Sequence, residues 1–266
     1  MRGVLVGALC GLARTLERGV TASTFVAAGL LRFDALGRHM ADNWQHFGDQ
    51  QSEPDVAAGL FDWEKDFYGR FLRPDDRVLL VGCGTGRDLV PLLERGHRVE
   101  GLEPVAACAE MARTRLARRG LSAEVRTGDV ATAPLGGPFD AVIFSWFCYS
   151  YIPLRARRQA VLGRVRDHLT QDGRILISYA LAQPAPRRLP WRLARLAAQL
   201  SRSDWRPEYG DVFLARHDTG RIHFEHRFQP AEIEAEARAV ALSVAFHDHA
   251  TDGNIALTSP GPRSTP

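Results

Sequence analysis

The sequence has few cysteines, no long apolar run and little net charge. Its four cysteines show neither CxxC nor metal-ligand spacing, which favours free thiols in a reducing cytosol over a disulfide framework and predicts no metal centre. With 34 basic and 31 acidic residues, the net charge of +3 is too balanced to predict a nucleic acid as partner. The apolar run over 3–13 is too short to cross a bilayer. These absences favour a cytoplasmic protein whose 266 residues bury a substantial core.

The stretch over 77–88, which reads RVLLVGCGTGRD, organises the rest of the chain. Its unbroken apolar run over 78–81 predicts a strand buried on both faces of a parallel sheet. Glycines at every second position follow, and then comes an apolar, helix-like run over 89–93. A glycine-rich turn between a buried strand and a helix brings backbone N–H groups close to a ligand. A dinucleotide fingerprint needs a glycine where Arg87 stands, so NAD is not the predicted ligand.

Strands and helices alternate after this turn at a rhythm that predicts a parallel sheet with helices on both faces. The predicted strands that follow the first one are 97–102, 123–126, 139–145 and 174–179. The predicted helices of this part are 54–72, 105–119 and 154–169, the last with its arginines on the outer face. The fold class is therefore α/β, doubly wound and Rossmann-like.

The two ends of the chain depart from this alternation. We expect a helical cap over 1–53, with helices at 3–18 and 22–38, and a disordered tail over 261–266. Three interpretations of 1–39 stay open: a packed cap, a weak membrane-surface helix, or a start codon assigned too early, with Met40 as the true start. The main domain is predicted to span 54–260.

The alternation is also interrupted over 181–230, after the fifth strand. A basic amphipathic helix is predicted at 187–200. Two strands, 211–216 and 221–228, flank an Asp-Thr-Gly sequence that is typical of a hairpin turn. We expect this insertion to form a lid and part of an acceptor pocket. Beyond it, the predicted elements are a helix at 230–240 and closing strands at 243–247 and 254–258.

The first four predicted strands end in residues that suit a nucleoside. Ligands of open α/β sheets bind across the carboxyl ends of the strands. Glu103 ends the second strand, where its carboxylate can accept hydrogen bonds from both ribose hydroxyls. Asp129 follows the third strand and can meet an adenine amino group, while Val130 packs on the ring. Ser145 and Trp146 end the fourth strand.

The Gly-x-Gly-x-Gly turn, the acid after the second strand and the acid after the third resemble those of class I S-adenosylmethionine (SAM)-dependent methyltransferases. The resemblance extends over about 55–260. It implies a seven-stranded, mostly parallel sheet whose last strand is antiparallel, with SAM as cofactor. The cofactor-binding residues that it implies are Val81, Gly82, Cys83, Gly84, Thr85, Gly86, Glu103, Pro104, Asp129, Val130, Ser145 and Trp146. One departure is Leu80, because most members carry an acid two residues before the first glycine.

The resemblance implies a methyltransferase that passes a methyl group to a small-molecule acceptor by in-line displacement. One alternative is a membrane-associated methyltransferase of a lipid or prenylated acceptor, although a membrane is not the favoured partner. Another is a non-catalytic, methyltransferase-like partner protein, which Leu80 motivates. The acceptor atom and the oligomeric state stay open.

Catalytic residues are harder to identify, because methyl transfer mainly requires alignment of the nucleophile with the methyl group. The segment over 145–153 lacks the Asn/Asp-Pro-Pro-Tyr signature of amino-methyltransferases, and its aromatic residues fit an apolar acceptor or plain packing equally well. Candidate bases are His226 and His223 on the predicted hairpin, since histidine titrates near neutral pH. Strand alternation points His226 inward. Tyr149 is the third candidate.

Overall fold

The computed structural model describes residues 2–51, 58–183, 188–216 and 218–259 and divides into two compact units. Unit 1 comprises Met1–Asn43 and Gln183–Glu225, and unit 2 comprises Trp44–Ala182 and His226–Pro266. The sequence pattern predicts 1–53 and 181–230 as separate additions to one domain. The structure instead gathers most of both segments in unit 1.

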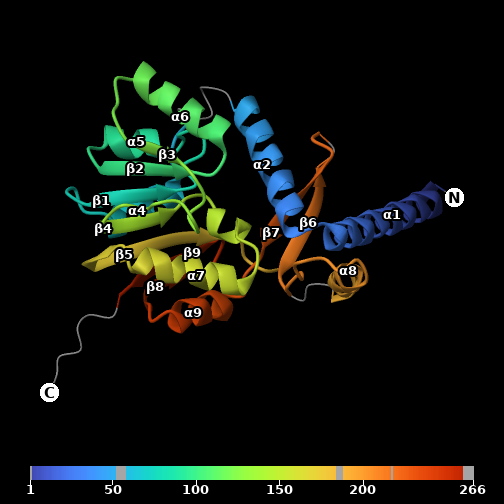
Figure 1. Ribbon diagram of the computed structural model, residues 1–266. Helices are drawn as coiled ribbons and strands as arrows, with labels where there is room; N and C mark the ends of the chain where they lie inside the picture. Colours follow the sequence, from blue (N-terminus) through green and yellow to red (C-terminus); the bar gives the residue numbers. More distant parts are fainter. Residues whose placement is uncertain (1, 52–57, 184–187, 217, 260–266) are drawn as a thin grey trace. The chain divides into compact units, whose positions relative to one another are not determined.

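A seven-stranded sheet forms the centre of unit 2, in the order β3-β2-β1-β4-β5-β9-β8 (Figure 1). Strands β1 to β5 pair in parallel, and β9 runs antiparallel to both β5 and β8. The predicted seven-stranded, mostly parallel sheet with an antiparallel last strand is therefore confirmed. Its strands are β1 (Arg77–Val81), β2 (Arg98–Glu103), β3 (Val125–Thr127), β4 (Phe139–Phe144), β5 (Leu169–Tyr179), β8 (Ser243–Asp248) and β9 (Gly253–Thr258).

Helices cover both faces of this sheet, because its central strands contain apolar runs whose successive side chains point to opposite faces. Leu79 and Val81 of β1 belong to one hydrophobic core, whereas Val78 and Leu80 belong to the other. The first core includes apolar residues of α7 and α9, and the second includes residues of α4, α5 and α6. The helices are α4 (Asp62–Phe71), α5 (Leu89–Glu94), α6 (Ala106–Arg118), the 3-10 helix η1 (Cys148–Tyr151), α7 (Arg155–Arg166) and α9 (Pro230–Ala239).

Unit 1 contains two N-terminal helices and the helix-plus-hairpin insertion after β5, as predicted. A T-shaped contact between Phe25 and Phe213, with ring centroids 5.0 Å apart, joins its first helix to the hairpin. Trp205 packs on Phe213 and Phe224 of the hairpin, and its indole N–H donates to Leu31 O at 2.9 Å. The elements are α1 (Arg2–Leu30), α2 (Phe33–Gln50), which continues into unit 2, α8 (Arg188–Leu200), β6 (Asp211–Arg216) and β7 (Arg221–His226).

The predicted boundaries were wrong at three helices. One continuous helix, α1, replaces the pair expected at 3–18 and 22–38, and α2 then continues as far as Gln50. Helix α4 begins at Asp62, because 58–61 are not helical, and the expected start at Pro54 lies outside the described residues. Arg158 of α7 is fully buried, so the arginines of that helix do not all face outward. The predicted tail at 261–266 also lies outside the described residues.

Among the described residues, no helix is both long enough and apolar enough to cross a membrane. This holds for α1 too, although its 29 residues would give a sufficient length.

Helices α1 and α8 cross at very close range, which generates a stability prediction. A Cβ atom added at Gly29 would overlap the carbonyl oxygen of Ala194, whereas a Cβ at Gly19 of the same helix meets nothing within 4 Å. We expect Gly29→Ala to destabilise unit 1 by about 1–3 kcal/mol through overpacking. Gly19→Ala should be neutral or stabilising, since alanine favours a helix over glycine by about 0.5–1 kcal/mol.

Urea unfolding of the two variants, followed by hydrogen exchange of the α1 and α8 amides, distinguishes the two effects. Equal stability of Gly29→Ala and Gly19→Ala would show that the two helices do not pack this closely in solution.

Candidate functional site

The glycine turn after β1 has a backbone that requires its glycines. Gly82, Gly84 and Gly86 have φ of +71°, +54° and +98°, in the left-handed region that side chains disfavour. A Cβ at Gly82 would also lie 2.9 Å from Cys148 Cβ, whereas a Cβ at Gly84 would point into open space. Gly84 therefore offers bare backbone to any group that approaches the turn.

Glu103 joins this turn to the next strand and helix. One carboxylate oxygen accepts from Gly84 N and the other from Val105 N, both at 2.9 Å. The side chain is 95% shielded from solvent, and burial raises the pKa of the carboxyl while the two N–H donors lower it. Sheet order explains the meeting, because β2 lies beside β1 with Leu102 opposite Val81. Glu103 and the glycine turn are thus neighbours at the carboxyl-terminal end of the sheet.

A buried chain of charges lies on the other side of the turn. The Arg87 guanidinium binds both oxygens of Glu64, at 2.6 and 2.7 Å, and lies 2.7 Å from Asp88. Asp88 in turn accepts a short hydrogen bond from the Ser145 hydroxyl at the end of β4. Burial and, to a smaller extent, the nearby Glu64 raise the pKa of Asp88 to about 7, against the opposing effects of Arg87 and Ser145. Two carboxylates thus share one guanidinium.

Asp129 and Val130 lie after β3, next to the end of β2, since Thr127 pairs with Glu103. One Asp129 oxygen accepts from Ala131 N at 2.8 Å, and the other forms an ion pair with Arg157 at 2.6 Å. Val130 is buried in the core. The acid predicted to meet adenine is therefore already engaged by an arginine of α7, which sequence spacing could not indicate.

Trp146 occupies a strained turn within an aromatic cluster. Trp146 and Phe147 have φ of 33° and 62°, which is uncommon for bulky residues and occurs at binding sites more often than elsewhere. Ring contacts at 4.8–6.5 Å link the members of this cluster, and Arg87 lies over Trp146 at 5.4 Å. Its members are Trp44, Phe47, Phe61, Trp63, Trp146, Phe147 and Tyr151.

Two of the three candidate catalytic residues lie in a buried polar cluster of unit 2. The Tyr149 hydroxyl donates to Glu236 at 2.8 Å, and Glu236 pairs with Arg158 at 2.7 Å. His226 Nε2 lies 3.3 Å from Glu232 and 3.5 Å from Arg158. All of these side chains except Glu232 are fully buried, and burial beside Glu236 raises the pKa of Tyr149. Such fully paired groups are typical of a structural network.

His223 lies on β7, in the part of that strand that belongs to unit 1. It is half-buried, and burial lowers its pKa. Alternation along β7 buries Phe224 and His226, in agreement with the predicted inward direction of His226.

Sequence reasoning missed two features of the site. Glu64 and Arg87 carry no motif, so their pairing was not foreseen. The second feature is the meeting of the aromatic residues over 145–153 with those over 44–63. Phe61 of this cluster is 45% exposed. The signal available in the sequence was the concentration of aromatic residues before β1 and after β4.

Comparison with known proteins gives a partial match at the level of sequence. A family model described as a methyltransferase domain matches residues 78–173, which span β1 to the early part of β5. A protein-L-isoaspartate O-methyltransferase of Methylorubrum populi is 40% identical over 107 residues, which are 40% of this chain and 46% of that protein. A dTDP-3-amino-3,6-dideoxy-alpha-D-glucopyranose N,N-dimethyltransferase of Streptomyces fradiae is 33% identical over 100 residues, 38% of each. The chain thus spans less than half the length of these relatives.

Comparison of folds extends the match beyond that segment. A SAM-dependent methyltransferase structure from Methanosarcina mazei superposes with a TM-score of 0.61 at 17% identity, covering 77% of this chain and 100% of that one. The sheet order, the glycine turn after β1 and the matched family model agree. The chain thus has the fold of SAM-dependent methyltransferases, and its residues 78–173 match a methyltransferase domain.

Proposed function

We propose that this chain is a SAM-dependent methyltransferase with a small-molecule acceptor. The proposal rests on one observation. The glycine turn after β1, Glu103 at the end of β2 and Ser145 after β4 lie together at the carboxyl ends of three neighbouring strands. SAM supplies an activated methyl group on its sulfonium when it is bound. The turn at 82–86 and Glu103 would hold it, with the Gly84 backbone open to its approach.

The chemistry needs little beyond this alignment. The methyl group moves to the acceptor in line with the departing sulfur, and positioning alone lowers such barriers by about 7–11 kcal/mol. The fully paired Tyr149 is poorly suited to accept a proton, because its hydroxyl already donates to Glu236. His223 and His226 stay predictions for a base, as does a lid over 181–230.

The aromatic cluster around Trp146 supports an apolar or aromatic small-molecule acceptor. It lies at the end of β4, where the strained backbone of Trp146 holds the ring beside Phe47 and Phe61. The similarity to an amino-sugar methyltransferase also favours a small molecule. The isoaspartate relative is named for a protein substrate, and it covers only 40% of this chain.

The buried charges around Arg87 can replace the acid that is missing at Leu80. Leu80 is fully buried among apolar side chains and offers no carboxylate to the glycine turn. Asp88 lies just beyond the turn and is tied through Ser145 to the end of β4. We propose that Asp88 and its Glu64–Arg87 partners orient the turn in place of the missing acid. This favours a working cofactor site over a non-catalytic protein.

The first prediction for the site concerns Glu103. We expect Glu103→Gln to weaken binding of S-adenosylhomocysteine about 10- to 100-fold, because charge-assisted hydrogen bonds to hydroxyls are worth about 1.5–3 kcal/mol each. Isothermal titration calorimetry measures the change. Glu110→Gln on the exposed face of α6 is the matched control and should bind like the parent chain. Parental affinity in a folded Glu103→Gln variant would remove Glu103 from the cofactor site.

The second prediction concerns pH. Asp88 has a pKa of about 7 in the folded chain, against about 3.8 when unfolded. Between these values the folded state binds a proton that the unfolded state releases, so the stability contribution of Asp88 falls as pH rises from about 4 to about 7. Asp88→Asn removes this titration. Urea unfolding at pH 4.5 to 8 should therefore show that the free energy of unfolding of Asp88→Asn increases relative to that of the parent chain as pH rises.

Asp62→Asn is the control for this series, because Asp62 is exposed and its pKa is lowered. Its titration is complete below pH 4.5, so its stability difference should stay constant over the same range. A constant difference for Asp88→Asn as well would mean that Asp88 is ionised throughout.

A further inference from the structure

Helix α8 presents three of its four leucines to solvent and its small residues to the protein, while Leu193 is half-buried. Ala194, Ala197 and Ala198 are buried, and Ala194 contacts α1 at Gly29. The larger Leu189, Leu196 and Leu200 are 67%, 51% and 75% exposed. Spacings of seven and four residues place these three on one side of the helix. A helix whose only role was to pack on its own unit would bury its leucines first, since they gain most from leaving water.

A basic strip runs beside these leucines. It consists of Arg188, Arg192 and Arg195, all exposed and spaced four and three residues apart. Helix α8 has no acidic residue, and within the described part of the chain no carboxylate forms an ion pair with these three arginines. Aromatic rings hold two of them instead: Arg195 lies 5.1 Å from the Trp191 ring and Arg188 lies 5.6 Å from the Tyr209 ring. The positive charges are thus presented to solvent.

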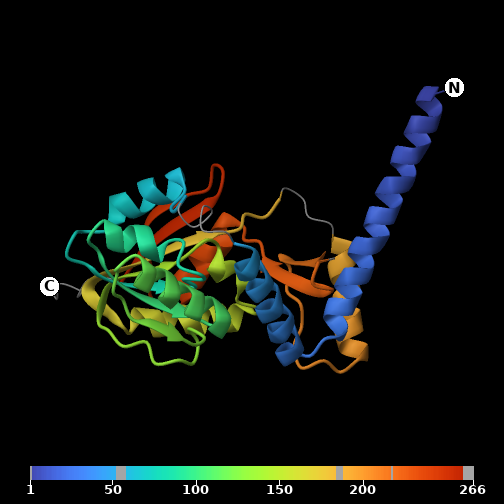
Figure 2. The same cartoon turned by 90° about the horizontal axis from the view of Figure 1, so that it is seen from above.

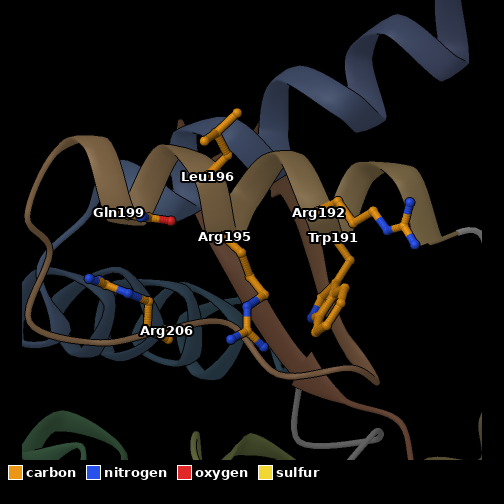
Figure 3. Close-up of a pocket in the computed structure, with 6 residues that line it drawn as sticks. All are labelled: Trp191, Arg192, Arg195, Leu196, Gln199 and Arg206. Carbon is orange, nitrogen blue, oxygen red and sulfur yellow. The ribbon is translucent and has the colours of Figure 1, made fainter.

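A cavity of about 350 Å³ opens at the basic strip. In Figure 3, Trp191 and Arg195 extend from α8 to the same side, and Arg206 lies on the loop that follows the helix. Arg206 donates to three backbone carbonyls of that loop region, at 2.7–3.1 Å, so its charge is fixed in place. The lining consists of Trp191, Arg192, Arg195, Leu196, Gln199 and Arg206. Three guanidinium groups without a carboxylate make this a cavity for an anion.

The first helix of unit 1 carries a second exposed apolar strip. Leu9, Leu12, Leu16 and Val20 follow helical spacing and are 51–62% exposed. The residues of α1 that pack against the unit, such as Phe25 and Ala28, lie on another side and nearer its C-terminal end. Figure 2 shows the N-terminal part of α1 extending beyond α8. Arg14 and Arg18 accompany this strip.

We propose that unit 1 binds the surface of an anionic phospholipid bilayer, with the α8 leucines in the interface and the α8 arginines on lipid phosphates. Apolar residues beside a basic strip are the combination that interfacial helices use. Charge complementarity selects phospholipid: the exposed face of α8 is positive and has no acid with which to pair a second copy of itself. The sequence alone did not favour a membrane, and the outward direction of the leucines is the observation that changes this. The surface is independent of the proposed methyl transfer.

Vesicle flotation of the full chain, without SAM, tests this proposal. The probes are vesicles of phosphatidylcholine alone and of phosphatidylcholine with 30 mol% phosphatidylglycerol. The wild-type chain should float with the anionic vesicles and only weakly with the neutral ones, and 0.5 M NaCl should release it, since salt screens such contacts.

Two α8 variants separate charge from apolar contact. The double variant Arg192→Gln with Arg195→Gln should bind anionic vesicles roughly 30-fold more weakly. Each arginine near such a surface contributes about 1 kcal/mol to binding, and about 1.4 kcal/mol corresponds to a tenfold change in affinity. Leu189→Gln with Leu196→Gln and Leu200→Gln should also weaken it, in low salt. The matched control is the double variant Arg95→Gln with Val244→Gln, at two exposed residues of unit 2. It should float like the wild type. Circular dichroism verifies that each variant is folded.

Several outcomes would overturn the proposal. Equal flotation with neutral and anionic vesicles would remove the role of the arginines, and unchanged binding of both α8 variants would remove the surface. Displacement of the protein by 10 mM inorganic phosphate at constant ionic strength would indicate a free anion as the ligand. A dimer in sedimentation velocity that the leucine variant dissociates, without vesicle binding by the wild type, would indicate that a second copy covers this face.

Discussion

The site of this protein depends on one carboxylate, that of Glu103. It accepts a backbone N–H from the glycine turn and another from the start of α6, so three segments meet on a single side chain. A buried carboxylate is tolerated only when donors replace its water, and here the main chain provides them. The same two oxygens are those that ribose hydroxyls would approach. On the proposed function, Glu103 would therefore couple cofactor binding to the conformation of the turn.

Buried charges on the other side of the turn follow a similar principle. Arg87 is shared between Glu64 and Asp88. Burial, with the nearby Glu64, raises the pKa of Asp88 to about 7 even though Arg87 acts to lower it. Arg158 and Glu236 instead form a fully matched pair, to which Tyr149 adds a donor. A matched pair fixes packing, whereas an unmatched acid stays responsive to pH. Asp88 also lies directly after the glycine turn and binds Ser145 at the end of β4, which supports the proposal that its cluster orients that turn.

The alternating pattern of the sequence was sufficient for the fold of unit 2. Apolar runs such as 78–81, followed by a glycine turn, predicted the sheet. They also predicted that Glu103 and Ser145 lie at the same end of it, because the carboxyl ends of parallel strands all lie on one side. The pairing of Arg87 with Glu64 was not predictable, since it joins residues 23 positions apart across a turn whose path no local pattern determines. Asp129 was correctly located after its strand, but its engagement by Arg157 depends on the packing of α7.

Helix α8 shows a further limit of periodicity. The pattern of apolar residues over 188–200 indicates a two-sided helix, and the natural expectation is that the leucine side faces the protein. The structure reverses this, because the crossing with α1 at Gly29 is so close that only alanines fit between the two backbones. Three of the four leucines are thereby left outside, next to arginines that form no ion pair with any described carboxylate. A steric requirement at one helix crossing therefore determines which face of unit 1 is available to a membrane.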